Sequence, residues 1–471
     1  MTRMSEKRSN AVPHFRIEAI EGKHLQHADS ISCVIGRNLF VVPQVLGAYY
    51  CLRPLTRVMD DLVLVAGVVA FADKIVKRRH SIGWRRQLDI VAPVYDLDFW
   101  RQRHAVGLLQ ETLGLLTGDT WSFTFRHRRT PPPVDGQHQL KLGHGRVSVM
   151  PYSDGLDSFA MARLAAASEK GVALILVTAG RRRDADIEWR TDHLDGQRRR
   201  VSVPFRLSDK GAGYEFRESS FRSRAFVFGV MAGLAAYLSE STRVIVPESG
   251  QGTFGPWLLP VGSEAPDIHS HPIFTHRLSR FLELAIGTRI RFEHPRRWHT
   301  KGETLRALRE QGLTGGWSGT HSCARRSYHV NVDGRRAHCG VCAACLLRRQ
   351  SILAAGLDEA DDRYVWRDLS ADNLAAAVPA SARSTTEDDS RHAICGALAL
   401  SQLAEVGVSS RFDDIVAQAA SDLAEASQEP LDILGTKFTH LIKTHRDEWA
   451  AFVRRQGPRA FLNRWTDAIA C

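Results

Sequence analysis

The sequence predicts an α/β fold, a parallel sheet with helices on both faces, flanked by an N-terminal α+β module and a C-terminal helical region. Two observations predict this arrangement. From residue 146 onward, short apolar strands alternate with amphipathic helices, which is the pattern of a parallel sheet. Towards the C-terminus the apolar spacing becomes purely helical. The expected divisions are residues 1–145, residues 146–370 and residues 385–471.

The N-terminal module mixes strand and helix patterns. Residues 39–42, stopped by Pro43, and residues 91–95 are short apolar runs typical of strands. Residues 63–76 predict a buried helix and residues 100–116 an amphipathic one. We therefore expect an α+β accessory module at this end of the chain.

The central and C-terminal elements follow in order. The expected central strands are residues 147–150, 172–177, 201–207 and 243–247, and the expected central helices are residues 157–167, 222–238, 272–286 and 301–310. The expected C-terminal helices are residues 393–404, 412–426, 431–444 and 449–455.

The composition argues for a soluble protein. Apolar residues make up 44% of the 471 residues and charged residues 24%, as in globular domains. The longest apolar run, residues 62–72, is roughly half of the ~20 residues that a membrane span needs. Residues 1–10 lack the apolar stretch of a signal peptide. We therefore expect a cytoplasmic location and no membrane partner.

The chain is basic, with a formal net charge of +11. Arginines cluster at residues 181–183 and at residues 198–200. Such clusters fit a nucleic acid, but solvated arginine-rich loops also explain them. Because an anionic nucleotide needs only a few local positive charges, the net charge does not decide between a nucleotide and a polynucleotide.

The first candidate site is a short polar turn between strand 147–150 and the helix that follows. Its sequence is Ser153-Asp154-Gly155-Leu156-Asp157-Ser158. A turn in this position aims backbone N–H groups at a polyanion, and Gly155 permits close approach. Ser153 and Ser158 add hydroxyl donors, and Asp157 can hold Mg²⁺ against a phosphate. The alternative is an ordinary helix cap.

The second candidate site is a set of cysteines in residues 323–345. It comprises Cys323 and the C-x2-C-x2-C run of Cys339, Cys342 and Cys345. Thiolates at this spacing fit a tetrahedral, structural Zn²⁺ site. In a reducing compartment, metal binding is favoured over disulfides. His321, His329 and His338 could replace one cysteine as a ligand.

The polar turn resembles the PP-loop, Ser-Gly-Gly-x-Asp-Ser, of ATP pyrophosphatases, which split ATP between its α and β phosphates. It is not a Walker A loop, because the Gly-Lys-Ser/Thr ending is absent. Asp154 departs from the motif by replacing its first glycine. That carboxylate brings negative charge towards the phosphates and therefore either weakens ATP binding or recruits a second cation.

A PP-loop followed by this cysteine pattern resembles 7-cyano-7-deazaguanine synthase, the QueC family. Three further stretches between residues 146 and 366 are similar to it: Arg222-Ser223-Arg224, Thr300-Lys301-Gly302-Glu303 and Leu346-Leu347-Arg348-Arg349. The resemblance implies an adenine-nucleotide α-hydrolase-like sheet with a zinc knuckle. The candidate catalytic residues are Asp157 and three cations, Lys301, Arg222 and Arg224. The three cations would neutralise the charge of the departing pyrophosphate. The alternative is that these cations are ordinary surface or helix-terminal charges.

The resemblance also implies a reaction. ATP activates the carboxylate of 7-carboxy-7-deazaguanine, ammonia attacks it, and the amide is dehydrated to a nitrile. Three stretches look more like the enlarged QueC-like proteins of anti-phage systems such as Qat: residues 115–121, residues 246–252 and His271-Pro272. In those systems an amine on a partner protein is a candidate acceptor.

We therefore expect an ATP-dependent ligase with Zn²⁺ and Mg²⁺ that adenylates a deazapurine carboxylate for attack by an amine, in bacterial anti-phage defence. ATP, the deazapurine and an operon-encoded acceptor protein are the expected partners. Two alternatives remain open: a PP-loop enzyme that modifies a tRNA base, and a non-catalytic nucleotide-sensing scaffold.

Overall fold

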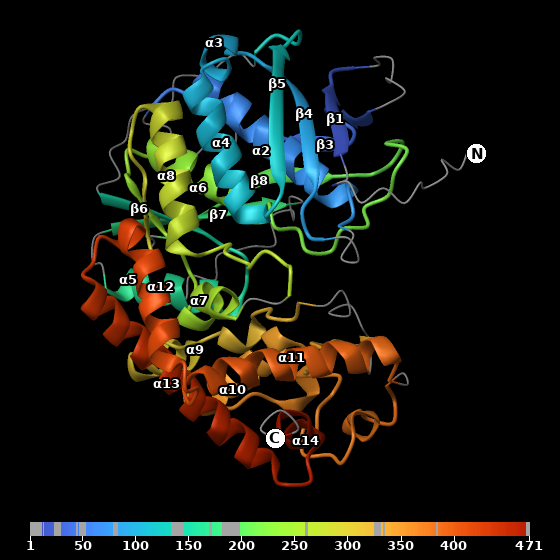
Figure 1. Cartoon of the computed structure of the whole chain (residues 1–471), viewed down its shortest axis with the longest axis vertical. Coiled ribbons are helices and arrows are strands. Elements are labelled where there is room, and N and C mark those ends of the chain that lie inside the picture. Colours follow the sequence, from blue (N-terminus) through green and yellow to red (C-terminus); the bar gives the residue numbers. More distant parts are fainter. Residues whose placement is uncertain are drawn as a thin grey trace.

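The computed structural model describes most of the chain (Figure 1). The described residues are 12, 14–22, 30–43, 46, 53–78, 83–132, 146–168, 172–180, 198–259, 262–324, 331–332, 335–382 and 385–467. The arginine cluster 181–183 and His329 lie outside them. In the second cluster, only Arg200 has a described side chain.

The centre of the molecule is a six-stranded sheet in which every strand except β3 runs parallel to its neighbour. In spatial order the strands are β10 (Arg291–Glu293), β9 (Arg243–Ile245), β6 (Arg146–Pro151), β7 (Val172–Gly180), β8 (Arg198–Leu207) and β3 (Leu39–Val41). From β6 the chain first moves outward through β7 and β8. It then returns to β9 on the other side of β6.

Both faces of this sheet are buried, as the sequence predicts. Side chains alternate along β6, so that Val149 faces one apolar cluster and Met150 another. On the Val149 side the sheet contacts α6 (Arg224–Leu238), which packs against α2 (Arg57–Ile75) and α8 (Pro272–Ile286). On the other side lie α5 (Leu156–Ser168), α9 (Lys301–Glu310) and α10 (Ala343–Ala354).

The N-terminal residues form a second, four-stranded sheet, drawn in blue and cyan in Figure 1. Its order is β2 (Ile31–Val34), β1 (His14–Ile20), β4 (Gln87–Val94) and β5 (Thr120–His127), all parallel. The helices α3 (Leu97–Trp100) and α4 (Arg103–Thr117) join β4 to β5, and α4 packs against α8. Because β3 pairs with β8, the N-terminal residues also extend the central sheet.

The C-terminal helices pack against the cysteine segment. They are α11 (Glu387–Val406), α12 (Phe412–Ser427), α13 (Leu431–Gln456) and α14 (Phe461–Asp467). The sequence predicts two helices where α13 runs unbroken, because His445 and Glu448 interrupt the apolar pattern. Both of these polar side chains are buried against neighbouring helices, so the interruption does not mark a chain break.

The shorter elements of the described residues are α7 (Gly250–Leu258), 3₁₀ turns at Trp317–Gly319, Asp361–Arg363 and Leu374–Ala377, and a hairpin of β11 (Asn331–Val332) with β12 (Arg335–Arg336). Among the described residues, no helix combines the length and the apolar character that crossing a bilayer would require.

Candidate functional site

The candidate site lies where the strand order of the central sheet reverses. The neighbours β6 and β9 both end at this edge, and the connections that leave them lead to opposite sides of the sheet. In open α/β sheets, ligands bind outside the carboxyl ends of the strands at such a switch point. The turn that begins at Ser153 follows β6, and the segment that begins at Val246 follows β9.

The turn after β6 has the tight geometry that its sequence indicates. Asp154 lies in the left-handed region with φ 57°, and its carbonyl accepts a 3.0 Å hydrogen bond from the N–H of His321. The hydroxyls of Ser153 and Ser158 are hydrogen-bonded at 3.0 Å across the turn. A Cβ on Gly155 would lie 3.1 Å from the Ser153 hydroxyl and 3.4 Å from the His321 carbonyl, so only glycine fits here without displacement.

Asp154, the residue that departs from the PP-loop pattern, has a cationic partner. Both of its carboxylate oxygens contact the guanidinium of Arg200 on β8, at 3.1 Å and 2.9 Å. A bidentate arginine–carboxylate pair is among the stronger ionic contacts. Arg200 therefore neutralises the extra negative charge of the turn. From the sequence, Arg200 is predicted only as part of a basic cluster, without a partner.

Asp157 and Lys301 form an ion pair, with the Lys301 Nζ 2.7 Å from Asp157 Oδ2. Lys301 is the first residue of α9, where a capping box between Thr300 and Glu303 fixes the helix start. Burial raises the pKa of Asp157 to about 6, although Lys301 opposes the shift; nearby Glu248 raises it further. Burial lowers the pKa of Lys301, but Asp157 and Glu248 outweigh it, and the net pKa is raised.

Asp157 also fits the Mg²⁺ that a PP-loop enzyme uses. Its second oxygen, Oδ1, is buried and accepts no hydrogen bond from any described residue. Glu248 places a second negative charge beside it. Hard oxygen donors of this kind suit Mg²⁺, which binds through one or two carboxylates together with substrate phosphates.

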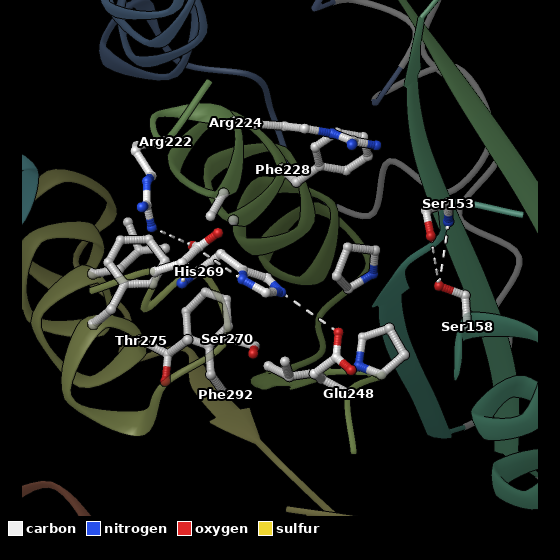
Figure 2. A pocket seen from close by; sticks show the side chains of 18 of the residues that line it. Ser153, Ser158, Arg222, Arg224, Phe228, Glu248, His269, Ser270, Thr275 and Phe292 are labelled. Carbon is white, nitrogen blue, oxygen red and sulfur yellow. Dashed lines mark hydrogen bonds and ion pairs between the residues drawn. The ribbon is translucent and has the colours of Figure 1, made fainter. Parts of the chain in front are cut away.

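A cavity of about 360 Å³ joins the turn to the segment after β9 (Figure 2). Ser153 and Ser158 line one side of it, and Arg222 and Arg224 line another. Its apolar wall carries aromatic and aliphatic side chains: Phe228, Val246, Phe274, Leu278 and Phe292. A pocket with an anion-holding rim and an apolar wall is suited to a flat, charged heterocycle.

The two arginines predicted from the sequence are held differently. Arg222 lies 3.3 Å from Asp267, and its guanidinium stacks over the ring of Trp84 at 5.0 Å. Arg224 lies over the ring of Phe228, 5.2 Å from its centroid (Figure 2). Both therefore line the cavity with the serines of the turn, whereas Lys301 is not among the lining residues and contacts the turn through its ion pair with Asp157.

Three charged residues that line the cavity, Glu248, Asp267 and His269, are not predicted as functional from the sequence. His269 lies between Asp267, at 3.2 Å, and Glu248, at 3.5 Å (Figure 2). Although burial opposes it, the two carboxylates raise the pKa of His269 to about 10, so its ring is cationic at neutral pH. The position of Glu248 just after β9, beside the PP-loop strand, is the signal that could have identified it.

The four cysteines come together as the sequence predicts. The Sγ atoms of Cys323, Cys339, Cys342 and Cys345 all lie within 4.8 Å of one another. Cys339 and Cys345 are separated by 3.8 Å, and four sulfurs at ~2.3 Å from a tetrahedral Zn²⁺ are about 3.8 Å apart. The donor set therefore fits a structural zinc ion. The backbone also orients the sulfurs, since the N–H of Cys339 donates to the sulfur of Cys323 at 3.4 Å.

Arg348, three residues after Cys345 in α10, has a structural role. It is fully buried and bonds the Thr320 hydroxyl at 2.8 Å and the Ser322 hydroxyl at 3.1 Å. Glu359 neutralises it at 2.6 Å. Arg348 thereby fixes the segment that leads into Cys323.

Comparison with known proteins agrees with this geometry. Residues 262–356 match the model of the family described as "Queuosine biosynthesis protein QueC". The match includes Lys301 and all four cysteines, and the turn of residues 153–158 lies upstream of it. No curated protein matches the chain. The part of the chain that carries Lys301 and the four cysteines is therefore similar to the QueC family.

Proposed function

We propose that this QueC-like chain adenylates the carboxylate of a 7-deazapurine, of the 7-carboxy-7-deazaguanine type, and transfers the acyl group to an amine. The reaction takes place in the cytosol of a bacterium, as part of an anti-phage defence system. The observation that carries the proposal is the shared cavity. It brings the hydroxyls of the PP-loop, two arginines and an apolar wall around one space of about 360 Å³.

The first step forms the acyl adenylate. A carboxylate oxygen of the substrate attacks the α-phosphorus of ATP, the bond from that phosphorus to the bridging oxygen breaks, and pyrophosphate leaves with the electron pair. Backbone N–H groups of residues 153–158 and the hydroxyls of Ser153 and Ser158 hold the phosphates. Lys301, Arg222 and Arg224 neutralise the charge that develops on pyrophosphate. Mg²⁺, held by Asp157, would supply further charge neutralisation.

The second step consumes the adenylate. The amine nitrogen attacks the activated carbonyl, AMP leaves with its bonding electron pair, and the amine loses a proton. Both substrates must be held in contact for this step, which favours a closed pocket over a surface site. The apolar wall formed by Phe228, Phe274 and Phe292 suits the heterocycle, and it keeps water from hydrolysing the adenylate.

Release of pyrophosphate tests the proposal. Purified protein with MgATP, 7-carboxy-7-deazaguanine and an amine such as ammonia is expected to release pyrophosphate and AMP, with a rate that depends on ATP and on the acid. Asp157→Asn removes the carboxylate that faces the phosphates and pairs with Lys301, so the rate should fall at least ~100-fold. Asp414→Asn, on the exposed surface of α12, is the matched control and should retain the wild-type rate.

Each alternative predicts a different result. Turnover that requires RNA, together with salt-sensitive RNA binding, would indicate a tRNA-modifying enzyme instead. Tight binding of ATP without turnover, whatever acid or acceptor is added, would indicate a nucleotide sensor. The defence role is tested separately by plating phage on cells that carry the chain and its neighbouring genes. Protection should disappear with Asp157→Asn and persist with Asp414→Asn.

A further inference from the structure

We infer that the N-terminal residues help to build the candidate site, because Asp73 and Trp84 act as positioning residues for Arg222 and Arg224. The inference deepens the proposed function, and rests on it in one respect: the two arginines are taken to bind the anionic substrates. No ligand contact is assigned to the N-terminal residues themselves. They act through the segment that leads into α6.

The N-terminal residues contain a buried ionic cluster, defined here as Asp73, Arg78, Arg86 and Asp119. All four side chains are at most 4% exposed. Arg86 contacts Asp73 and Asp119 at 2.6 Å each, and Arg78 contacts the same carboxylates at 3.1 Å and 2.7 Å. Burial would raise the pKa of Asp73, but Arg86 and Arg78 hold it below its usual value. Asp73 is therefore ionised.

One oxygen of Asp73 reaches outside the cluster. Its Oδ2 accepts a 2.8 Å hydrogen bond from the N–H of Ser223, the residue between the two arginines of the pocket. Ser223 is also the N-cap of α6, and it is fully buried. A carboxylate at a helix N-terminus stabilises the helix start. Asp73 therefore fixes, from 150 residues away, the first turn of the helix that carries Arg224.

Arg78 holds the same segment from its other end. Its N–H donates to Glu218 at 2.8 Å, and its guanidinium donates to the Ser220 hydroxyl at 2.8 Å. Glu218 in turn accepts from the N–H of Ser220 at 2.9 Å. Residues 218–223 are thus bound to the cluster at three points, and Arg222 lies within this bound stretch.

Trp84 contacts Arg222 directly. The guanidinium of Arg222 lies 5.0 Å from the Trp84 ring centroid, and that of Arg78 lies 4.5 Å from it. The indole is itself fixed, because its Nε1 donates to the Thr117 carbonyl at 2.7 Å. The stack aligns Arg222 towards Asp267 and the cavity, where it can face an anion without reorganising.

The composition of the cluster favours a positioning role. Buried ion pairs add little net stability compared with well-packed apolar residues, because each charge is desolvated. Such a network does fix the positions of the groups that it contacts. Here it fixes the backbone of Ser223 through Asp73, and Trp84 beside it holds the guanidinium of Arg222; both residues belong to the segment 218–223.

The experiment compares Trp84→Leu, Trp84→Phe and Arg222→Ala, with Trp465→Leu on α14 as the control. Binding of pyrophosphate and of a nonhydrolysable ATP analogue is measured by calorimetry. Trp84→Leu removes the stacking ring and should weaken binding roughly five- to tenfold, whereas Trp84→Phe should restore most of it. Trp84→Leu added to Arg222→Ala should weaken binding less than about twofold further, because both changes act on one interaction.

A second measurement does not depend on ligand binding. Amide hydrogen exchange of residues 218–226 should be about tenfold faster in Trp84→Leu and Asp73→Asn, with no change in α13. Because Asp73→Asn can unfold the chain, the Trp84 variants decide the result. Unchanged exchange in these residues overturns the inference. So does a full, additive loss of binding in the double variant, which would mean that Trp84 acts independently of Arg222.

The two hypotheses fail in distinguishable ways. If the wild-type chain binds neither anion, the proposed function fails, and the exchange measurement alone judges whether Asp73 and Trp84 fix the segment. If Arg222→Ala binds both anions as tightly as the wild type, Arg222 is not an anion ligand and the inference is overturned as stated.

Discussion

Arg200 and Asp154 form a bidentate pair at the start of the turn of residues 153–158, with contacts of 3.1 Å and 2.9 Å. The loop therefore carries a carboxylate where related loops have glycine, together with the cation that neutralises it. Asp154 adopts the left-handed backbone that glycine would allow, at φ 57°. The pairing makes Asp154 compatible with the phosphate site that we propose here.

Removing Arg200 should expose the charge of Asp154. We expect Arg200→Ala to weaken binding of MgATP roughly tenfold, because an unpaired carboxylate then repels the phosphates. Asp154→Gly should bind MgATP at least as tightly as the wild type. Adding Arg200→Ala to Asp154→Gly should lower the affinity for MgATP only slightly. Calorimetric titration of the wild type, the two single variants and the double variant with MgATP gives the coupling free energy between Arg200 and Asp154. Equal losses from Arg200→Ala in both backgrounds would mean that Arg200 contacts the nucleotide itself.

Zinc should stabilise the packing of the C-terminal helices as well as the cysteine segment. Cys339, Cys342 and Cys345 lie in one apolar cluster with Ala397 of α11 and Trp449 of α13. We expect Cys342→Ser to lower the bound zinc below the ~1 ion per chain of a closed site, and to lower the thermal midpoint. Metal analysis and thermal melts measure both effects. Cys395→Ser, at an exposed free cysteine, is the control and should change neither.

At Gly396, α11 lies against the backbone of the segment that carries the cysteines. A Cβ at this position would lie 2.6 Å from the backbone nitrogen of Ala343 and 2.9 Å from the carbonyl carbon of Cys342. Because a backbone cannot rotate aside, Gly396→Ala should lower the free energy of unfolding by about 1–3 kcal/mol. Gly107→Ala in α4 meets nothing within 4 Å and should raise it by up to ~1 kcal/mol. Urea unfolding compares the two, and a similar effect at both sites would contradict the packing.

Glu448 should make the stability of the chain depend on pH. Its carboxylate accepts a 2.8 Å hydrogen bond from Thr300, just before Lys301, and burial raises its pKa from 4.5 to about 7. Because the folded state binds this proton more tightly than the unfolded state, the stabilisation is complete below pH 4.5 and lost as the pH rises to about 7. The loss is of the order of 3 kcal/mol at most.

Glu448→Gln removes this titration while keeping an oxygen for Thr300. We expect the variant to gain stability relative to the wild type between pH 5 and pH 8, as measured by urea unfolding at each pH. The exposed Glu310→Gln is the control, and its difference from the wild type should not depend on pH in this range. A wild-type chain whose stability rises from pH 5 to pH 8 as steeply as that of Glu448→Gln would contradict the burial of an ionisable carboxylate here.

Local signals made much of the central domain predictable. The helix at residues 301–310 has the bounds that the sequence predicts, and a capping box between Thr300 and Glu303 fixes its start. The turn of residues 153–158 and the cysteine run of residues 339–345 were also predictable, because the residues of each are contiguous in the sequence. By contrast, β1, β2 and β5 were not predicted. These strands are stabilised through pairing in the N-terminal sheet, and β4 comes from about 70 residues beyond β1.

The partners of the site residues could not be predicted for the same reason. Asp154 and Arg200 are separated by 46 residues, and Asp73 and Ser223 by 150. Each sequence motif indicates which chemical group is present, but the neighbour that neutralises or orients it comes from a distant element. For His269 this holds for one partner alone: Asp267 is two residues away in the sequence, whereas the fold brings Glu248 to the ring across 21 residues.

The pairing of β3 with β8 limits how the chain can be shortened. Residues 39–41 cover the last three residues of β8, and Leu39 packs so closely on α2 that a Cβ on Gly67 would lie 2.6 Å from it. A fragment beginning at residue 146 would lose this cover and leave the apolar end of β8, including Phe205, as an open edge. Open edges of this kind recruit strands from other molecules. Expression of the central domain alone is therefore expected to give aggregates.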